Sequence, residues 1–270
     1  MEAFRYPVAF FSHGTPMLAY GEDRYQEMLH QFAAQFPKPR AVIILSAHSV
    51  SSDRIHILRT KENRIQHDFN GFPTELYEIE YRCPGEPEVA DEAGQLLKAA
   101  GMAVSFDDNA PLDHGIWIPM LHLFPKGDVP VVRVSLPLNL TPAQILKMGH
   151  ALAKLREEGV LMIASGGAVH NIRELKWSEK TGSGAPWANE FEEWLVQMLF
   201  QKNVDALITA DEQPQFSAAH PSLEHYLPIL FAIGASLPAD EPTVLYRGVE
   251  YGSLSMLCFS LNHAQKKSLH

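Results

Sequence analysis

The feature that most constrains the fold is a series of short, largely apolar runs that alternate with segments of helical spacing. Runs without polar alternation are typical of strands buried on both faces of a sheet. Four such runs lie at residues 8–11, 41–45, 129–134 and 160–164. Segments with helical spacing lie at residues 22–36, 87–100, 141–158, 187–201 and 223–233. This alternation predicts an α/β domain in which helices flank a largely buried central sheet.

The rest of the chain adds a loop and two further strands. Residues 64–85 are rich in glycine, proline and aromatic side chains, which predicts a long ordered loop. Strands are predicted near 243–246 and 255–260. Because no repeat, low-complexity tract or linker divides the chain, we expect one catalytic domain over residues 1–262 and a disordered tail at 263–270.

Charge and hydropathy narrow the classes of partner. The formal net charge is −10 and is spread along the chain, which disfavours nucleic-acid binding. No window holds 18 consecutive apolar residues, so we expect no membrane-spanning helix and no membrane partner. The N-terminus lacks the basic and apolar stretches of a signal peptide, and we therefore expect a cytoplasmic protein.

The cysteines exclude one kind of metal site. Cys83 and Cys258 are far apart and form no C-x-x-C pair. Two cysteines are too few for a disulfide framework or for a zinc-finger type of thiolate site, so we expect both to be reduced. Histidine is more prominent, with 13 residues, and the placement of these histidines is informative.

Three of the apolar runs each lead into a segment that carries a histidine, namely His13, His48 and His170. In open α/β sheets, ligands collect beyond the carboxyl ends of the strands, so these segments are expected to converge on one site. Neutral imidazole is a common ligand of zinc and of iron. The sequence thus predicts a histidine-based metal site, open to substrate, at the carboxyl ends of the strands.

Each of these histidines also has an ordinary structural explanation. His13, in SHGTP, can cap a turn after its strand, although the following glycine would let a ligand approach. His48 can be a hydrogen-bonded histidine at the rim of the sheet. The small residues before His170, in SGGAVH, indicate either a backbone crowded near a ligand or a simple turn.

Four further histidines lie in informative contexts. His220 and His225 frame the segment HPSLEH, and position alone leaves each open between a site and a core or surface role. On a helix, Glu224 and His225 would point about 100° apart, so only one of them is expected to face the site. His114 follows an aspartate and is either part of a helix start or an acid–base group. His67 has the same ambiguity, and a turn explains it better.

Seven motifs around these histidines occur in order and span residues 12 to 256. They are SHGTPM (12–17), SAH (46–48), HDFNGFP (67–73), DHGIW (113–117), SGGAVHN (165–171), EHYLP (224–228) and GSLSM (252–256). This set resembles the class III extradiol ring-cleavage dioxygenases, in particular their DOPA 4,5-dioxygenase branch. One such motif is weakly specific, whereas seven in order with the expected histidines are specific.

The resemblance implies a fold, a metal and a set of site residues. It implies a single α/β domain around a mixed sheet, a catechol and O2 as substrates, and non-haem iron(II) as the metal, with zinc also described in this branch. By motif, His13, His48 and His225 match the metal ligands. His170 matches either a fourth ligand or the catalytic base. His114 matches a second active-site histidine that steers oxygen or supplies a proton.

Two features leave the substrate and the metal open. Ser49 follows His48 where members of the branch often carry tryptophan, and this changes one wall of the pocket. An all-histidine ligand set is neutral and suits zinc as well as iron. The main alternative is therefore a zinc-dependent hydrolase that activates water on the same histidines. A non-catalytic metal-binding protein is a second alternative.

Aromatic side chains in the motifs are candidates to stack on a planar substrate, although core packing explains any single one of them. They are Phe69, Phe72, Trp117 and Tyr226. The assembly state is open, and a homodimer is expected only because homodimers are the commonest assembly.

Overall fold

The computed structural model describes residues 4–21 and 23–263, and an eight-stranded sheet with the order β4-β3-β5-β2-β6-β1-β10-β7 forms its centre. The strands are β1 (Val8–Ser12), β2 (Ala41–Ser51), β3 (Ile55–Leu58), β4 (Val104–Asp107), β5 (Val131–Pro137), β6 (Val160–Gly166), β7 (Asp240–Tyr246) and β10 (Cys258–His263). The central strands β1, β6, β2 and β5 run parallel, whereas β10 and β7 continue the sheet antiparallel. The sheet is therefore mixed, as the resemblance implied.

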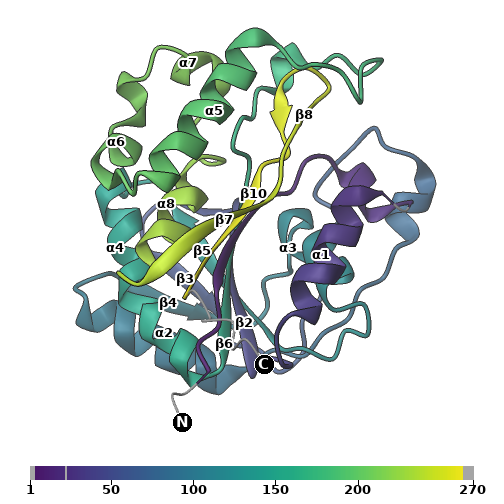
Figure 1. Ribbon diagram of the computed structural model, residues 1–270. Helices are drawn as coiled ribbons and strands as arrows, with labels where there is room; N and C mark the ends of the chain where they lie inside the picture. The colour runs from purple at the N-terminus through teal and green to yellow at the C-terminus, as the bar shows by residue number, and fades with distance from the viewer. Residues whose placement is uncertain (1–3, 22, 264–270) are drawn as a thin grey trace, which may run out of the picture.

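Helices cover both faces of this sheet (Figure 1). One face carries α1 (Arg24–Ala34) and α3 (His114–Leu123). The other face carries α2 (Pro87–Ala99), α4 (Pro142–Leu152), α5 (Pro186–Phe200) and α8 (Leu227–Gly234), with the short helices α6 (Val204–Ile208) and α7 (Phe216–Ala219) beyond them. A small hairpin of β8 (Val249–Glu250) and β9 (Leu254–Ser255) packs beside α5. The molecule is thus a single α/β domain with three layers.

Alternation along the central strands divides the buried side chains between two cores. In β2, Ala41, Ile43 and Leu45 pack into the core shared with α4 and α8. The intervening Val42 and Ile44 pack into the core shared with α1 and α3. Because successive side chains of a strand point to opposite faces, a fully apolar run serves both cores at once. This explains why the predicted strands show no polar alternation.

Each element that the sequence predicted has a counterpart, but several elements were missed, among them β3, β4 and α3. β3 and β4 have only four residues each, too few for a clear pattern. α3 contains Pro119 and is buried on nearly all sides, so it lacks the apolar stripe that marks a surface helix. The helix predicted from residue 223 begins only at Leu227, because residues 221–226 form turns.

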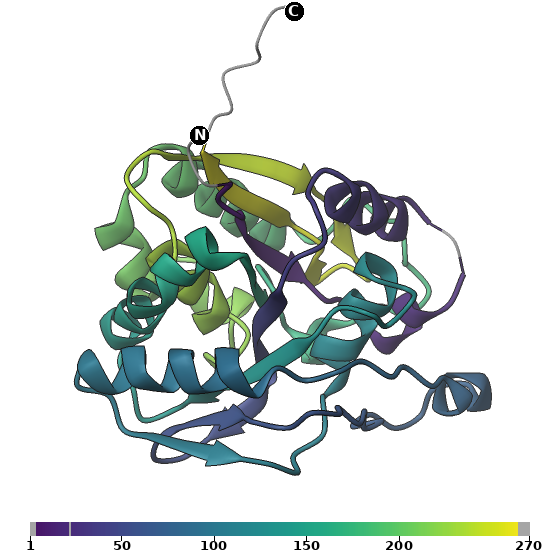
Figure 2. The same ribbon diagram turned by 90° about the horizontal axis from the view of Figure 1, so that it is seen from below.

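The segment between β3 and α2 is the long ordered loop that its composition predicted. Its helical part is the 3-10 turn η2 (Thr74–Glu78), and Figure 2 shows the loop reaching outward from the sheet. Two backbone hydrogen bonds, from Gln66 N to Leu112 O at 2.9 Å and from Leu112 N to Arg64 O at 2.7 Å, hold the start of the loop beside α3. They place the residues after Gln66 next to the beginning of that helix.

The end of the chain bears on two expectations. His263 is the last residue of β10, and the rest of the expected tail, residues 264–270, lies outside the described residues. Among the helices of the described residues, none combines the length and the apolar character needed to cross a membrane.

Candidate active site

Three imidazoles from distant parts of the chain meet at one point. The possible ligand atoms of His13, His48 and His225 all lie within 4.8 Å of one another. The Nε2 atom of His48 is 3.0 Å from that of His13 and 3.3 Å from that of His225. Three Nε2 atoms directed at a common point are the donor set of an open histidine metal site.

The sheet explains how two of these side chains come together. His13 directly follows β1, and its backbone N donates to Gly166 O at the end of the neighbouring β6, at 3.0 Å. His48 lies within β2 itself, which continues to Ser51 rather than ending at Leu45 as the sequence predicted. The pairing of β2 with β5 is irregular between Leu45 and Val50, and His48 lies in that stretch. Both histidines are therefore at the carboxyl end of the parallel strands, as expected.

A close backbone approach places His225. Gly167 N donates to His225 O at 3.0 Å, and a Cβ atom on Gly166 would lie 2.5 Å from that oxygen. Only glycine fits at residue 166, because any side chain would displace the turn that carries His225. The small residues before His170 thus indicate a crowded backbone, but the neighbour that crowds Gly166 is the His225 carbonyl rather than a ligand.

Neighbouring side chains fix the orientation of two of the rings. The Nδ1 atom of His13 is 2.9 Å from Ser165 Oγ, which donates its own proton to Gly115 O. Ser165 must therefore accept from His13, so Nδ1 of His13 carries the proton and Nε2 is free to bind a metal. The Nδ1 atom of His225 is 3.3 Å from Glu224 Oε1. Partners on the far ring nitrogen are the usual support of metal-binding histidines.

Burial keeps the three imidazoles neutral. It lowers the pKa of His13 and of His225 well below the ordinary value, and the neighbouring histidines lower both further. Burial also lowers the pKa of His48 to about 4, with His114 as the next cause. Neutral rings keep a lone pair for a cation at neutral pH. The donor set therefore fits a divalent transition metal.

His170 lies beside this group rather than within it. Its ring stacks on that of His225, with 3.4 Å between the ring centroids and 4° between the planes. His170 is not one of the three residues whose ligand atoms lie within 4.8 Å of one another. Burial, followed by repulsion from His220, lowers the pKa of His170 to about 4, so this ring is also neutral at pH 7.

His114 also borders the group and has a carboxylate partner. Its ring centroid is 4.1 Å from that of His48. His114 N donates to Asp68 Oδ1 at 2.8 Å, and His114 Nδ1 lies 3.1 Å from Asp68 Oδ2. Burial alone would raise the pKa of Asp68, but the contacts with His114 hold it below the usual value. Asp68 was not predicted as a site residue, although the HDF motif that contains it gave a signal.

The carboxylate of Asp113, the residue before His114, contacts two serines rather than the start of the helix. Asp113 precedes α3, but its side chain does not cap the helix. Instead, its carboxylate accepts from Ser46 Oγ at 2.7 Å and from Ser49 Oγ. These two serines flank His48 on β2, so Asp113 ties down the backbone on both sides of that histidine. Ser49, the departure from the branch's usual tryptophan, thus belongs to a buried network behind His48.

A pocket of about 690 Å³ opens over the histidines. His48, His114, His170, Glu224 and His225 all line it, so Glu224 and His225 both face the site, contrary to the expectation for a helix. The turn that precedes α8 removes the 100° separation on which that expectation rested.

The aromatic candidates divide into two groups. Phe69 and Phe72 line the pocket and are available to contact a planar ring. Trp117 and Tyr226 are fully buried in the two cores, which confirms the core-packing explanation for them.

Two other histidines considered in the sequence analysis lie outside the group of possible ligands. His220 is buried among Phe191, Phe216 and Tyr226, with its Nε2 atom 3.0 Å from Ala168 O. His67 is half-buried, and its Nε2 atom lies 3.2 Å from Ile79 O within the long loop. Both therefore have structural surroundings that account for them.

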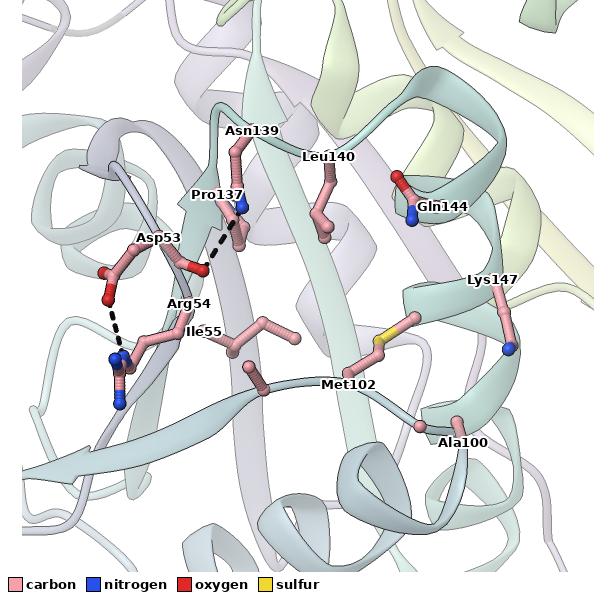
Figure 3. Close-up of a pocket in the computed structure, with 12 residues that line it drawn as sticks. Asp53, Arg54, Ile55, Ala100, Met102, Pro137, Asn139, Leu140, Gln144 and Lys147 are labelled. Carbon is pink, nitrogen blue, oxygen red and sulfur yellow. Dashed lines mark hydrogen bonds and ion pairs between the residues drawn. The ribbon is translucent and has the colours of Figure 1, made fainter.

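A second hollow, of about 170 Å³, shares no lining residue with the histidine pocket (Figure 3). Arg54 Nε lies 2.6 Å from Asp53 Oδ2, and Asn139 Nδ2 donates to Asp53 O at 3.2 Å. The lining found among the described residues contains neither histidine nor cysteine. Because it offers no metal-binding imidazole or thiolate, this hollow does not rival the histidine pocket as a site.

Comparison with known proteins agrees with the geometry. Residues 7–253 match the family model described as the catalytic LigB subunit of aromatic ring-opening dioxygenase. The chain belongs to the LigB family. Like other LigB enzymes, it is a metal-dependent oxidoreductase, an extradiol dioxygenase that opens an aromatic ring with O2. This confirms the fold, the activity and the family that the seven motifs implied.

Relatives of this LigB enzyme match over most of their length. An Escherichia coli K12 protein named 4,5-DOPA dioxygenase extradiol is 34% identical over 261 residues, which covers 95% of each chain. A Beta vulgaris protein of the same name is 33% identical, covering 91% of this chain and 92% of the relative. The crystal structure of an uncharacterised protein from Escherichia coli K12 superimposes with a TM-score of 0.82 at 30% identity, covering 96% of this chain and 100% of that one.

Proposed function

We propose that this LigB-family enzyme opens a catechol of the DOPA type and uses iron(II) as its metal. The observation that carries the proposal is the convergence of the Nε2 atoms of His13, His48 and His225 beside an aromatic-lined pocket. The substrate class is supported by relatives that are named 4,5-DOPA dioxygenase extradiol.

The metal would be held by the three neutral imidazoles. Bound iron(II) supplies the redox chemistry that O2 needs and a template on which both substrates are oriented. A neutral three-histidine set also accepts zinc, which has no redox chemistry of its own. Zinc-loaded protein is therefore the natural inactive control for the iron enzyme.

We assign proton transfer to the two histidines that border this group. His170 is neutral and lines the pocket, which suits it to accept a proton from a catechol hydroxyl. His114 lies beside His48 and is held by Asp68, which suits it to donate a proton as the ring opens. Phe69 and Phe72 would contact the face or edge of the substrate ring and exclude water from it.

The test is oxygen uptake by protein reconstituted anaerobically with iron(II) and given a panel of catechols. We expect uptake together with a yellow ring-opened product from the iron-loaded protein and none from the zinc-loaded control. Protein with one iron per chain that consumes no oxygen with any catechol would contradict the proposal and would favour the zinc-dependent hydrolase.

Three further expectations stay proposals. These are the cytoplasmic location, the homodimer and the end of the domain at residue 262. For the location, support comes from Cys83 and Cys258, which are both buried and free, as expected of cysteines in a reducing compartment.

A further inference from the structure

We infer that the enzyme prefers catechols whose ring substituent has no net negative charge over catechols whose substituent is a lone carboxylate, so DOPA, in which an ammonium group accompanies the carboxylate, stays in the favoured class. The inference deepens the proposed function and rests on the histidine pocket being the catechol site. It is argued from the charges and the apolar surface that line this pocket.

Among the described residues, the pocket lining contains the carboxylate of Glu224 but no arginine or lysine that could pair with a carboxylate of the substrate. Apart from histidines, Glu224 is the sole acidic or basic side chain among the described residues that line the pocket. Its Oε1 atom accepts from Ser222 Oγ at 2.7 Å and is 3.3 Å from His225 Nδ1, so its position is fixed. A substituent whose only charged group is a carboxylate would meet a like charge and find no arginine or lysine in the lining.

Residues 172–177 form one wall of the pocket, and the two cationic side chains of this segment do not line it. Ile172, Leu175 and Trp177 line the pocket, whereas the intervening Arg173 and Lys176 do not. Lys176 Nζ lies 3.7 Å from Glu179 Oε2, and it therefore has a carboxylate partner of its own. Neither of these two cations is therefore among the residues that line the pocket.

The mouth of the pocket is apolar. Val50, Leu138, Ile172 and Trp177 all line it, although 49%, 51%, 63% and 57% of their surfaces are exposed. Exposed apolar side chains gathered at one site are typical of a surface that contacts a ligand. An alkyl substituent would bury this surface, and an ammonium group has both Glu224 and the Trp177 ring as favourable neighbours.

The test uses three catechols with substituents of similar length and different charge. They are 4-propylcatechol (neutral), dopamine (cationic) and 3-(3,4-dihydroxyphenyl)propionate (anionic). For the iron enzyme, we expect kcat/KM for the neutral and cationic compounds to exceed that for the anionic compound about tenfold or more. The same order of affinity, and therefore lower Kd values for the neutral and cationic compounds, is expected with zinc-loaded protein, measured by calorimetry without oxygen.

Variants at the mouth of the pocket test whether the charge of the lining causes the preference among the three catechols. Leu138→Arg places a cation at an exposed position of the lining and should raise the anionic-to-neutral ratio of kcat/KM and of affinity about five- to tenfold. Leu138→Gln is the matched neutral control, and it should change this ratio less than about twofold.

The outcomes separate the inference from the proposed function. Absence of oxygen uptake with all three catechols overturns the proposed function, whereas the Kd order still tests the pocket's preference. Equal or tighter binding of the anionic compound overturns the inference even if all three compounds are turned over. An unchanged ratio in Leu138→Arg also overturns it, because charge would then not determine the preference.

Discussion

The stacking of His170 on His225 distinguishes two kinds of histidine in one small volume. His13, His48 and His225 direct their Nε2 atoms at each other, whereas His170 lies flat against one of these rings. This geometry favours a base over a fourth ligand for His170. The two roles that the motif left open for His170, fourth metal ligand and catalytic base, predict different effects of replacing this residue.

For His170→Ala, we expect one metal per chain to be retained and kcat to fall about 10²- to 10⁴-fold. His48→Ala is the matched variant, and it should lose the metal because it removes one of the three converging nitrogens. Metal analysis after dialysis, together with oxygen uptake, distinguishes them. Loss of the metal from His170→Ala would instead make His170 a ligand.

Ser165 determines which nitrogen of His13 points at the other two imidazoles. Removing its hydroxyl leaves His13 Nδ1 without the partner that lies 2.9 Å away, so the ring is no longer held in one orientation. For Ser165→Ala, we expect metal affinity to fall about 10- to 100-fold. Affinity is measured by competition with a chelator. Ser260→Ala removes another buried serine hydroxyl, on β10, and should leave the affinity unchanged.

Between elements, the contact of β6 with the turn before α8 is the tightest constraint on the site. A methyl group on Gly166 would lie 2.5 Å from His225 O and 3.3 Å from the Phe10 ring. We expect Gly166→Ala to lower the free energy of unfolding by about 1–3 kcal/mol, because the core must shift to admit the methyl group.

Urea unfolding of the metal-free protein measures this effect. Gly182→Ala is a suitable control, because a Cβ atom there meets its nearest neighbour at 3.7 Å. Metal affinity of Gly166→Ala should also fall, since the displaced turn carries His225. Unchanged stability and affinity would contradict the role given to this contact.

The elements also show what the sequence could and could not predict. Apolar runs identified the strands that carry His13 and His48, because both faces of the sheet are buried. The network of Asp113 with Ser46 and Ser49 was not predicted, because it depends on the docking of α3 against β2. Asp68 was missed for a related reason, since the loop that presents it is placed by contacts with distant residues.

For the whole molecule, the buried histidines make stability depend on pH. Burial lowers the pKa values of His48, His170 and His220 to about 4 in the folded protein, against about 6.5 in an unfolded chain. The unfolded state thus binds more protons between these values. The contribution is fully present above pH 6.5 and is lost as the pH falls towards 4.

We therefore expect the urea midpoint of the metal-free protein to fall steadily from pH 7 to pH 5. His220→Gln should make this slope shallower, because it removes a buried imidazole without touching the three converging nitrogens. His150→Gln, at an exposed histidine, is the control and should leave the slope unchanged. A midpoint that is constant or rises on acidification would contradict the expected linkage.

The three converging histidines come from widely separated parts of the chain, and His48 and His225 are 177 residues apart. During synthesis at roughly 5–20 residues per second, His225 leaves the ribosome on the order of 10 s or more after His48. A nascent chain therefore presents two of the three imidazoles before the third exists. We therefore expect a complete three-histidine site only after His225 has been made and the turn before α8 has docked on β6, although β10, which pairs with β1, still has to be synthesised at that point.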